Sequence, residues 1–322
     1  MIALQRGKAS GVLAAARDLL LGVQVVRPDG RSFQRGRMVV KNVAGYDLAR
    51  LQYGAFGALG VITSLIFKLH PLPETSAAVI GAFASPQDAD TVARRLLDSR
   101  LQPVTVLIFT PLTVDAAAAP VSSGHHWRLL ARFDGRALAV QRQVGEVTTW
   151  LREAGAAEIE TMDTDAVATF WPTLTDFSQM AVCGDDEALL RVIVRSSETA
   201  AALIEFAATD NNVFAAFATM ALADVANGVI WLRVRGDVSR LPGAIAQWRV
   251  RWPQTILAAA PPAIKTQLNL WGAPPSALRV MQRLKQHFDP HGVLSVGRDL
   301  VSASMTPTGA SAPAAGEVQH VR

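Results

Sequence analysis

The feature that most constrains this chain is a set of three glycines, spaced three residues apart, directly before an apolar segment. We name residues 54–60, which contain Gly54, Gly57 and Gly60, the glycine ladder. Glycine adopts positive φ and lets the backbone approach another group closely. Residues 61–69 are rich in β-branched side chains and predict a strand. In the Rossmann dinucleotide-binding fingerprint the glycines follow a strand and open a helix, so the reversed order argues against that fold.

Residues just ahead of the ladder favour a ligand-binding interpretation. Gly45, Tyr46 and Asp47 combine a residue able to adopt left-handed backbone, an amphipathic aromatic and a short carboxylate. Two backbone-exposing segments so close together would offer main-chain donors and acceptors to one large polar ligand. Two plainer interpretations stay open, namely a tight turn without a ligand and an aspartate that bonds its own backbone. Lys41 either balances charge on a ligand or lies in solvent at a strand end.

Three segments together resemble a known family. Residues 39–74, VVKNVAGYDLARLQYGAFGALGVITSLIFKLHPLPE, resemble the second half of the flavin-binding domain in FAD-linked oxidoreductases of the vanillyl-alcohol-oxidase (PCMH) type. Within that family the likeness is greatest to the FAD-binding subunits of bacterial glycolate oxidase. Residues 16–30 are similar to the strand-turn-strand that leads into this region. Residues 271–275 and 283–298 resemble the closing helix and loop of the family.

The resemblance implies a cofactor, a reaction and a set of contacts. FAD would carry the chemistry, and the substrate would be a 2-hydroxy acid such as glycolate, which is oxidised to glyoxylate as its α-hydrogen leaves as a hydride equivalent. An arginine would bind the substrate carboxylate, and the candidates by residue type are Arg233, Arg235 and Arg298. No catalytic residue is assigned. The residues implied in FAD binding are Gly45, Tyr46, Asp47, Gly57, Leu59, Gly60, Val61 and Ile62.

Two features depart from the family pattern. The proline- and glycine-rich loop that wraps the FAD pyrophosphate is not visible ahead of residue 39, so we expect a partial flavin-binding lobe. Three explanations of the missing loop are open. The start of the chain is assigned too late, the protein is a real truncation, or another chain supplies the lobe. Residues 295–297 read Ser-Val-Gly where the family commonly has Asn-Pro-Gly.

Two functions remain open at this point. One is an FAD-binding subunit that passes electrons to a companion flavin subunit and an iron–sulfur subunit of a glycolate-oxidase-type complex. The other is a truncated, non-catalytic structural subunit that holds no FAD. The flavin spectrum of the purified chain would distinguish them.

Composition limits the remaining classes. The chain has 322 residues, of which 50% are hydrophobic, and this length suffices for two domains with cores of their own. The single cysteine, Cys183, excludes an internal disulfide framework and a cysteine-ligated cluster. Scattered basic residues and a net charge of +4 argue against a nucleic-acid surface. No metal site is expected, because neither the adjacent His125 and His126 nor the pair His287 and His291 completes a ligand set.

The sequence also predicts location. No signal peptide is visible, and the apolar segment 213–223 is too short to span a bilayer, so we expect a cytoplasmic protein without a transmembrane segment. Association with the membrane surface would then depend on partner subunits.

Alternating strand and helix patterns predict an α+β fold, in which a partial PCMH-type FAD-binding lobe precedes an α+β cap domain built on an antiparallel sheet. Ser85 and Pro86 predict the start of a helix. The acidic residues 185–187 predict a solvated loop before a strand. The predicted parts are the flavin lobe at 1–73, the cap at 74–270, a closing helix and loop at 271–300 and a disordered tail at 301–322.

Overall fold

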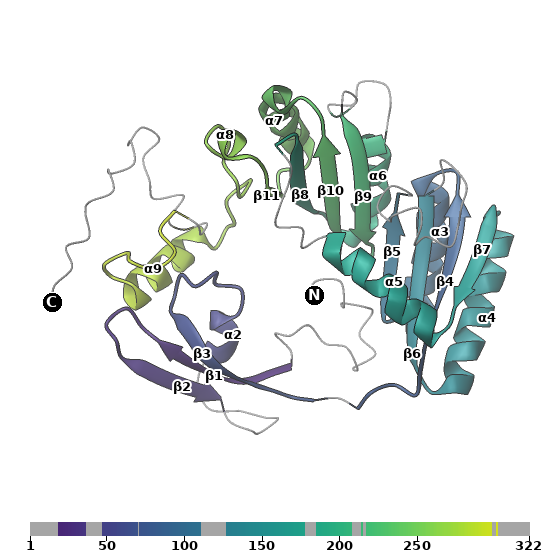
Figure 1. The fold of residues 1–322 in the computed structure, drawn as a ribbon, viewed down its shortest axis with the longest axis horizontal. Helices are drawn as coiled ribbons and strands as arrows, with labels where there is room; N and C mark the ends of the chain where they lie inside the picture. Colours follow the sequence, from purple (N-terminus) through teal and green to yellow (C-terminus); the bar gives the residue numbers. More distant parts are fainter. Residues whose placement is uncertain are drawn as a thin grey trace. The chain divides into compact units, whose positions relative to one another are not determined.

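The computed structural model describes most of the chain (Figure 1). The described residues are 19–36, 47–69, 71–110, 127–177, 185–207, 214, 217–297 and 301. The predictions for Cys183, for the histidines at 125 and 126 and for the tail from residue 302 lie outside them. The chain divides into a larger unit around Leu69–Ala273 and a smaller unit made of Leu19–Lys68 and the segment from Pro274 onward. The predicted boundaries after residues 73, 270 and 300 stay a proposal.

The larger unit is built on one antiparallel sheet of eight strands, in the order β11-β8-β10-β9-β5-β6-β4-β7. This sheet confirms the predicted α+β class with an antiparallel sheet. Its strands are β4 (Thr75–Phe83), β5 (Thr105–Phe109), β6 (Trp127–Gly135), β7 (Glu158–Met162), β8 (Glu187–Ile193), β9 (Ala218–Asp224), β10 (Val229–Arg235) and β11 (Thr255–Ala259). Its helices are α3 (Pro86–Asp98), α4 (Ala137–Glu153), α5 (Thr164–Phe177), α6 (Thr199–Ala207), α7 (Leu241–Arg251) and α8 (Pro262–Lys265), with short 3₁₀ turns at Ser196–Glu198 and Val238–Arg240.

The sheet is an internal duplication of one motif. Its first half runs β4-α3-β5-β6-α4-β7, and its second half runs β8-α6-β9-β10-α7-β11. In each half the last strand lies beside the first, the first beside the third and the third beside the second, which is the split βαβ arrangement. The halves join where β5 pairs antiparallel with β9. The second half thus repeats the topology of the first across this pair of strands.

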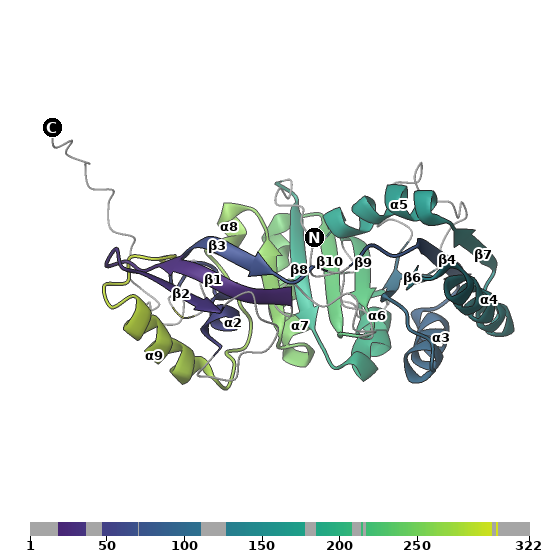
Figure 2. The same ribbon diagram turned by 90° about the horizontal axis from the view of Figure 1, so that it is seen from below.

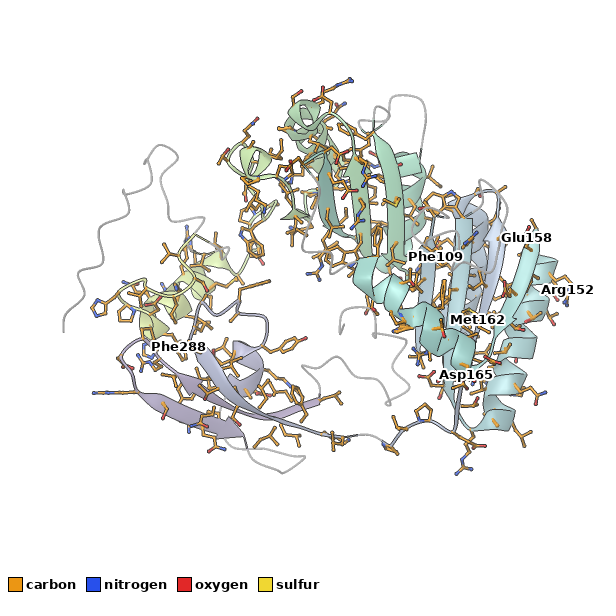
Figure 3. The ribbon with its side chains drawn as sticks, in the orientation of Figure 1. Phe109, Arg152, Glu158, Met162, Asp165 and Phe288 are labelled. Carbon is orange, nitrogen blue, oxygen red and sulfur yellow. The ribbon has the colours of Figure 1, made fainter. Side chains whose placement is uncertain are left out.

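Helices cover the two faces of this sheet unequally. Helices α3, α4, α6 and α7 lie on one face and α5 lies on the other (Figure 2). The four-helix face holds the larger apolar core, in which Phe206 packs edge to face with Phe214 and with Trp248. Beneath α5 a second core includes Phe109 and Met162, which Figure 3 labels. Because both faces bury side chains, the central strands have continuous apolar runs instead of an alternating pattern.

Within the described residues, the smaller unit is a three-stranded antiparallel sheet with two helices. Its elements are β1 (Leu20–Val26), β2 (Ser32–Gly36), α2 (Leu48–Gln52), β3 (Val61–Phe67) and α9 (Leu278–Phe288), and the sheet order is β2-β1-β3. Helix α9 contacts the sheet through Phe288, labelled in Figure 3, whose ring centroid lies 6.3 Å from that of Phe33. The guanidinium of Arg27 lies 5.9 Å from the Phe288 ring and donates to the carbonyl of His287.

Strand β3 lies at the edge of the small sheet and exposes apolar side chains. Val61, Ile62, Leu65 and Phe67 are between 40% and 54% exposed. The core of this unit is correspondingly small and consists of Leu20, Val23, Val25 and Ala49, with Phe33 packed against it. None of the helices within the described ranges is long and apolar enough to cross a bilayer.

One local prediction is wrong. Glu187 does not lie in a solvated loop, because it begins β8 and is only 3% exposed. Its cross-strand neighbour on β10 is Arg235, and the two side chains form an ion pair. A buried carboxylate paired across a ladder leaves no pattern in the local sequence, since its partner is 48 residues away.

Candidate functional site

The predicted site begins at α2, which Asp47 caps. The Asp47 carboxylate accepts a hydrogen bond of 3.0 Å from the Arg50 amide and lies 3.3 Å from the Arg50 guanidinium. This is the usual role of aspartate at a helix start, and it explains the residue without a ligand. Lys41, Gly45 and Tyr46 lie outside the described residues, so their predicted contacts remain predictions.

The glycine ladder is a loop with a dense series of left-handed residues. Gly54 and Gly57 have φ of +81° and +73°, and Phe56 between them has φ of +52°. A phenylalanine in this region is uncommon and carries a conformational cost of about 1–3 kcal/mol. Its side chain is also 65% exposed. A strained and exposed aromatic between two glycines is typical of a binding loop.

The last glycine of the ladder has a packing role. Gly60 is buried, and a Cβ placed on it would lie 2.4 Å from Cγ1 of Val25 on β1. The residues that follow enter the sheet at once, as Val61 and Ile62 pair with Val26 and Val25. Glycine is therefore required at position 60 for β3 to approach β1, whether or not a ligand is present.

Helix α9 holds the ladder, together with residues 289–297 (the closing loop), through a buried lysine that the sequence did not single out. Lys285 on α9 is 6% exposed. Its ammonium donates to the carbonyl of Ala58 at 3.0 Å, to Oδ2 of Asp289 at 2.6 Å and to the carbonyl of Leu294 at 2.7 Å. These three bonds use all three ammonium hydrogens. The ladder, α9 and the loop after α9 therefore meet at one side chain.

Asp289 is the charged acceptor in this network of hydrogen bonds. We name Lys285, Asp289 and the backbone groups that they bind the hub. Its carboxylate also accepts from the amides of Val293 at 3.0 Å and Leu294 at 2.8 Å. Burial by itself raises the pKa of this carboxyl, but the hydrogen bonds from Lys285, Leu294 and Val293 outweigh burial and hold the pKa below its ordinary value. The folded protein thus favours the ionised Asp289.

A second bond joins the closing loop to the ladder. The hydroxyl of Ser295 donates to the carbonyl of Phe56 at 2.7 Å. Ser295 has φ of +48°, so both partners of this bond are non-glycine residues in the left-handed region. Ser295 is one of the positions at which the sequence departs from the family's Asn-Pro-Gly pattern, and its hydroxyl provides this contact.

One buried amide in this region has an unpaired donor. Gln52, at the end of α2, is 3% exposed, and its Nε2 has no hydrogen-bond partner among the residues that the structure describes. Its Oε1 lies 3.8 Å from the position of a Cβ built on Gly60. A buried donor without a partner is costly, so this atom is fitted to receive an acceptor from a bound group. Sequence reasoning missed Gln52 because a glutamine in a short helix is ordinarily exposed.

The three arginine candidates have different surroundings. Arg235 is ion-paired with Glu187 and, at 3.7 Å, with Asp186, so its charge is already compensated. Arg233 is 6% exposed, and its guanidinium lies 5.4 Å from the ring of Phe177 on α5. Arg298 lies outside the described residues. The two described candidates therefore differ in burial, and Arg233 is the one that lies against α5.

Each half of the sheet has an arginine at an equivalent position, but the two arginines have different neighbours. Alignment of Gly135, which ends β6, with Gly236, which follows β10, makes Arg132 and Arg233 equivalent positions in the duplicated motif. Each of these arginines lies over an aromatic ring of α5, since Arg132 is 4.6 Å from the ring of Trp171. Asp134 pairs with Arg132 at 2.9 Å, and the equivalent position in the second half is the cationic Arg235.

Part of the larger unit is similar to a known family of domains. Residues 72–189 match the family model described as FAD linked oxidases, C-terminal domain. Over 167 residues the chain is 29% identical to the glycolate oxidase subunit GlcD of Bacillus subtilis, which covers 51% of this chain and 35% of that protein. Over 62 residues it is 44% identical to the glycolate oxidase subunit GlcE of Escherichia coli, which covers 19% of this chain and 18% of that protein.

Solved structures agree with this assignment of fold. The structure of p-cresol methylhydroxylase with substrate bound superposes with a TM-score of 0.55 at 14% identity, over 87% of this chain and 64% of that one. At this identity the likeness shows the fold alone. The chain spans about a third or less of the length of the two curated relatives that it matches here.

Proposed function

We propose that this chain, whose residues 72–189 match the family model of the C-terminal domain of FAD-linked oxidases, is an FAD-binding subunit of a glycolate-oxidase-type complex. Its reaction is the oxidation of a small 2-hydroxy acid at the carbon that bears the hydroxyl. FAD is the cofactor of the family and supplies the acceptor for the electron pair that leaves the substrate. The chain's own residues bind and orient the flavin and the substrate, and they exclude water.

The observation that carries the proposal is the glycine ladder together with the loop that holds it. Left-handed residues at Gly54, Phe56 and Gly57 expose main-chain groups, and Nε2 of Gln52, which has no acceptor among the described residues, adds a buried donor. Flavin dinucleotides present acceptor oxygens on the pyrophosphate, the ribityl chain and the ring. The donor set of this loop fits such a ligand without any charged side chain.

The substrate is proposed from Arg233. A 2-hydroxy acid presents one carboxylate, and a planar guanidinium matches that group with two parallel hydrogen bonds. Arg233 is stacked on Phe177 and buried, so it is held in place before substrate arrives. Buried and preorganised arginines lose little rotamer entropy on binding.

Partners and location are also proposals. GlcD and GlcE are named as subunits of glycolate oxidase, which supports a companion flavin subunit for this chain. An iron–sulfur subunit would take the electrons onward, because the sequence holds a single cysteine. We propose a cytoplasmic complex that reaches the membrane surface through these partners.

The visible spectrum of the purified chain tests the proposal. An oxidised flavin absorbs at about 370 and 450 nm. We expect these two bands in the chain as purified, or after addition of FAD and gel filtration. Anaerobic addition of glycolate or D-lactate is expected to bleach the longer-wavelength band. A chain that binds FAD but is bleached by neither acid would contradict the proposed substrate class.

The alternative is a structural subunit that holds no cofactor. A colourless protein that stays colourless with FAD, but that co-purifies with a companion flavin subunit, would favour this alternative.

A further inference from the structure

Two carbonyls of the glycine ladder accept hydrogen bonds from α9 and from the loop that follows it. The carbonyl of Phe56 accepts from the Ser295 hydroxyl, and the carbonyl of Ala58 accepts from the Lys285 ammonium. Ser295 and Lys285 are themselves linked, because the ammonium also binds the carbonyl of Leu294, the residue before Ser295. Helix α9 and the loop after it therefore fix the peptide planes that follow residues 56 and 58.

Fixing those two peptide planes also fixes two amides. The carbonyl and the amide of a trans peptide point in opposite directions, and the structure has no cis peptide bond. The amides in these planes belong to Gly57 and Leu59. Each amide must therefore point away from the side chain that binds the carbonyl of the same peptide, which is Ser295 for Gly57 and Lys285 for Leu59.

Neither amide is used by the protein in the part of the chain that the structure describes. The neighbouring amides of Ala55 and Ala58 donate to the carbonyls of Gln52 and Ala55, whereas those of Gly57 and Leu59 donate to none of the described residues. Gly57 is exposed, and Leu59 is 8% exposed. A buried amide is nearly always paired, so an unpaired amide at Leu59 points to a ligand.

We propose that Ser295 and the ion pair of Lys285 with Asp289 are positioning residues, which orient the amides of Gly57 and Leu59 as a pair of donors for oxygen atoms of the flavin dinucleotide. The inference rests on the proposed function, since it assumes that the ladder binds FAD. Lys285 does not contact the ligand, because its three hydrogens are already used within the hub. It acts through Ala58, and Ser295 acts through Phe56.

The acceptor oxygens belong either to the pyrophosphate or to the isoalloxazine ring. Both are oxygen acceptors that suit two adjacent backbone donors. ADP carries the pyrophosphate without the ring, and riboflavin carries the ring without the pyrophosphate. Weakened binding of one fragment by a positioning variant therefore identifies which oxygens the amides bind.

Ser295→Gly is the most informative change. Glycine accepts the positive φ of position 295 without strain, so only the hydroxyl is lost and the fold is retained. Lys285→Met removes the ammonium and leaves a buried carboxylate, so it tests the larger effect at the risk of instability. Arg283→Met is the matched control, because it removes an exposed cation from the same helix.

The measurement is the dissociation constant for FAD, ADP and riboflavin by fluorescence or calorimetric titration, beside the melting temperature of each variant. We expect Ser295→Gly to weaken FAD binding about tenfold, as one hydrogen bond of about 1.4 kcal/mol is lost, at an unchanged melting temperature. Lys285→Met should weaken it at least as much, and Arg283→Met should change it by less than about twofold.

The outcomes separate the two claims. A wild-type chain that binds no FAD overturns the proposed function and this inference with it. A wild-type chain that binds FAD, with Ser295→Gly and a folded Lys285→Met binding equally well, overturns the inference and leaves the proposed function intact. Ser295→Gly could also weaken the binding of FAD without weakening that of ADP or riboflavin. That result overturns the inference, because the Gly57 amide would then bind neither the pyrophosphate nor the ring.

Discussion

Substitution of Asp289 is the perturbation whose effect follows most directly from the geometry. Asp289→Asn keeps the shape of the side chain but removes its charge. The carboxylate accepts three hydrogen bonds, from Lys285 at 2.6 Å and from the amides of Leu294 and Val293 at 2.8 and 3.0 Å. An asparagine would direct its own NH₂ at one of these donors and leave the buried Lys285 without a counter-charge.

The expected loss of stability follows from these contacts. The Asp289 side chain is 0% exposed and that of Lys285 is 7% exposed, so solvent does not compensate the orphaned ammonium. Breaking one partner of a buried pair costs about 3–5 kcal/mol. We therefore expect the free energy of unfolding of the smaller unit to fall by about 3–5 kcal/mol, and the binding loop to loosen with it.

Urea unfolding followed by two signals is the assay. All seven tryptophans lie within Leu69–Ala273, so tryptophan fluorescence reports the larger unit, and far-UV circular dichroism reports both units. Asp29→Asn is the control, because Asp29 is exposed and lies 3.8 Å from Arg27. Such a surface pair contributes at most about 1 kcal/mol. A fall of less than about 1 kcal/mol in Asp289→Asn would refute the assignment of Asp289 as a buried counter-charge.

The pH dependence gives an independent check of sign. The pKa of Asp289 is lower in the folded protein than in the unfolded chain, where aspartate titrates near 3.9. Its contribution to stability is therefore complete above about pH 5 and is lost as the pH falls through the folded pKa. The stability gap between wild type and Asp289→Asn should shrink as the pH falls from about 6 toward 3. A gap that stays constant would contradict the ionised state.

Three further substitutions test other parts of the fold. Gly60→Ala should lower the free energy of unfolding by about 1–3 kcal/mol, measured by circular dichroism in urea, because its Cβ would lie 2.4 Å from Val25; a neutral result would contradict the close approach of β3 to β1. Gly145→Ala in α4 has open space around the new methyl group and should raise stability by about 0.5–1 kcal/mol in tryptophan-detected unfolding; a loss would show that the space is filled. Arg235→Met leaves Glu187 buried without its ion pair and should cost about 1–3 kcal/mol; adding Glu187→Gln should recover part of this loss, and simple additivity would count against the pair.

Much of the fold was predictable where the signal is local. The ladder and the strand at 61–67 follow from glycine spacing and β-branched residues. The start of α3 follows from Ser85, whose hydroxyl accepts from the Asp88 amide, and from Pro86 at the first helical position. Both features depend on neighbours within a few residues. Such signals survive without knowledge of the tertiary structure.

Other elements were not predictable. Helix α5 has a misleading local signal, because Pro172 lies inside it and predicts a break. The duplicated motif was missed because it consists of strand pairings, such as β8 with β11, and not of repeated sequence. In the site, Lys285 and Gln52 have no local sign of burial. A lysine four residues before an aspartate in a helical segment was the one available hint of the hub.

Hydrogen exchange with and without FAD tests the central claim most directly. Peptides covering residues 54–60 are compared with peptides from α4, which lies in the other unit. Binding of FAD to the ladder predicts that deuterium uptake falls at 54–60, including the amides of Gly57 and Leu59, while uptake in α4 is unchanged. Unchanged uptake at 54–60 at a saturating FAD concentration would contradict the account.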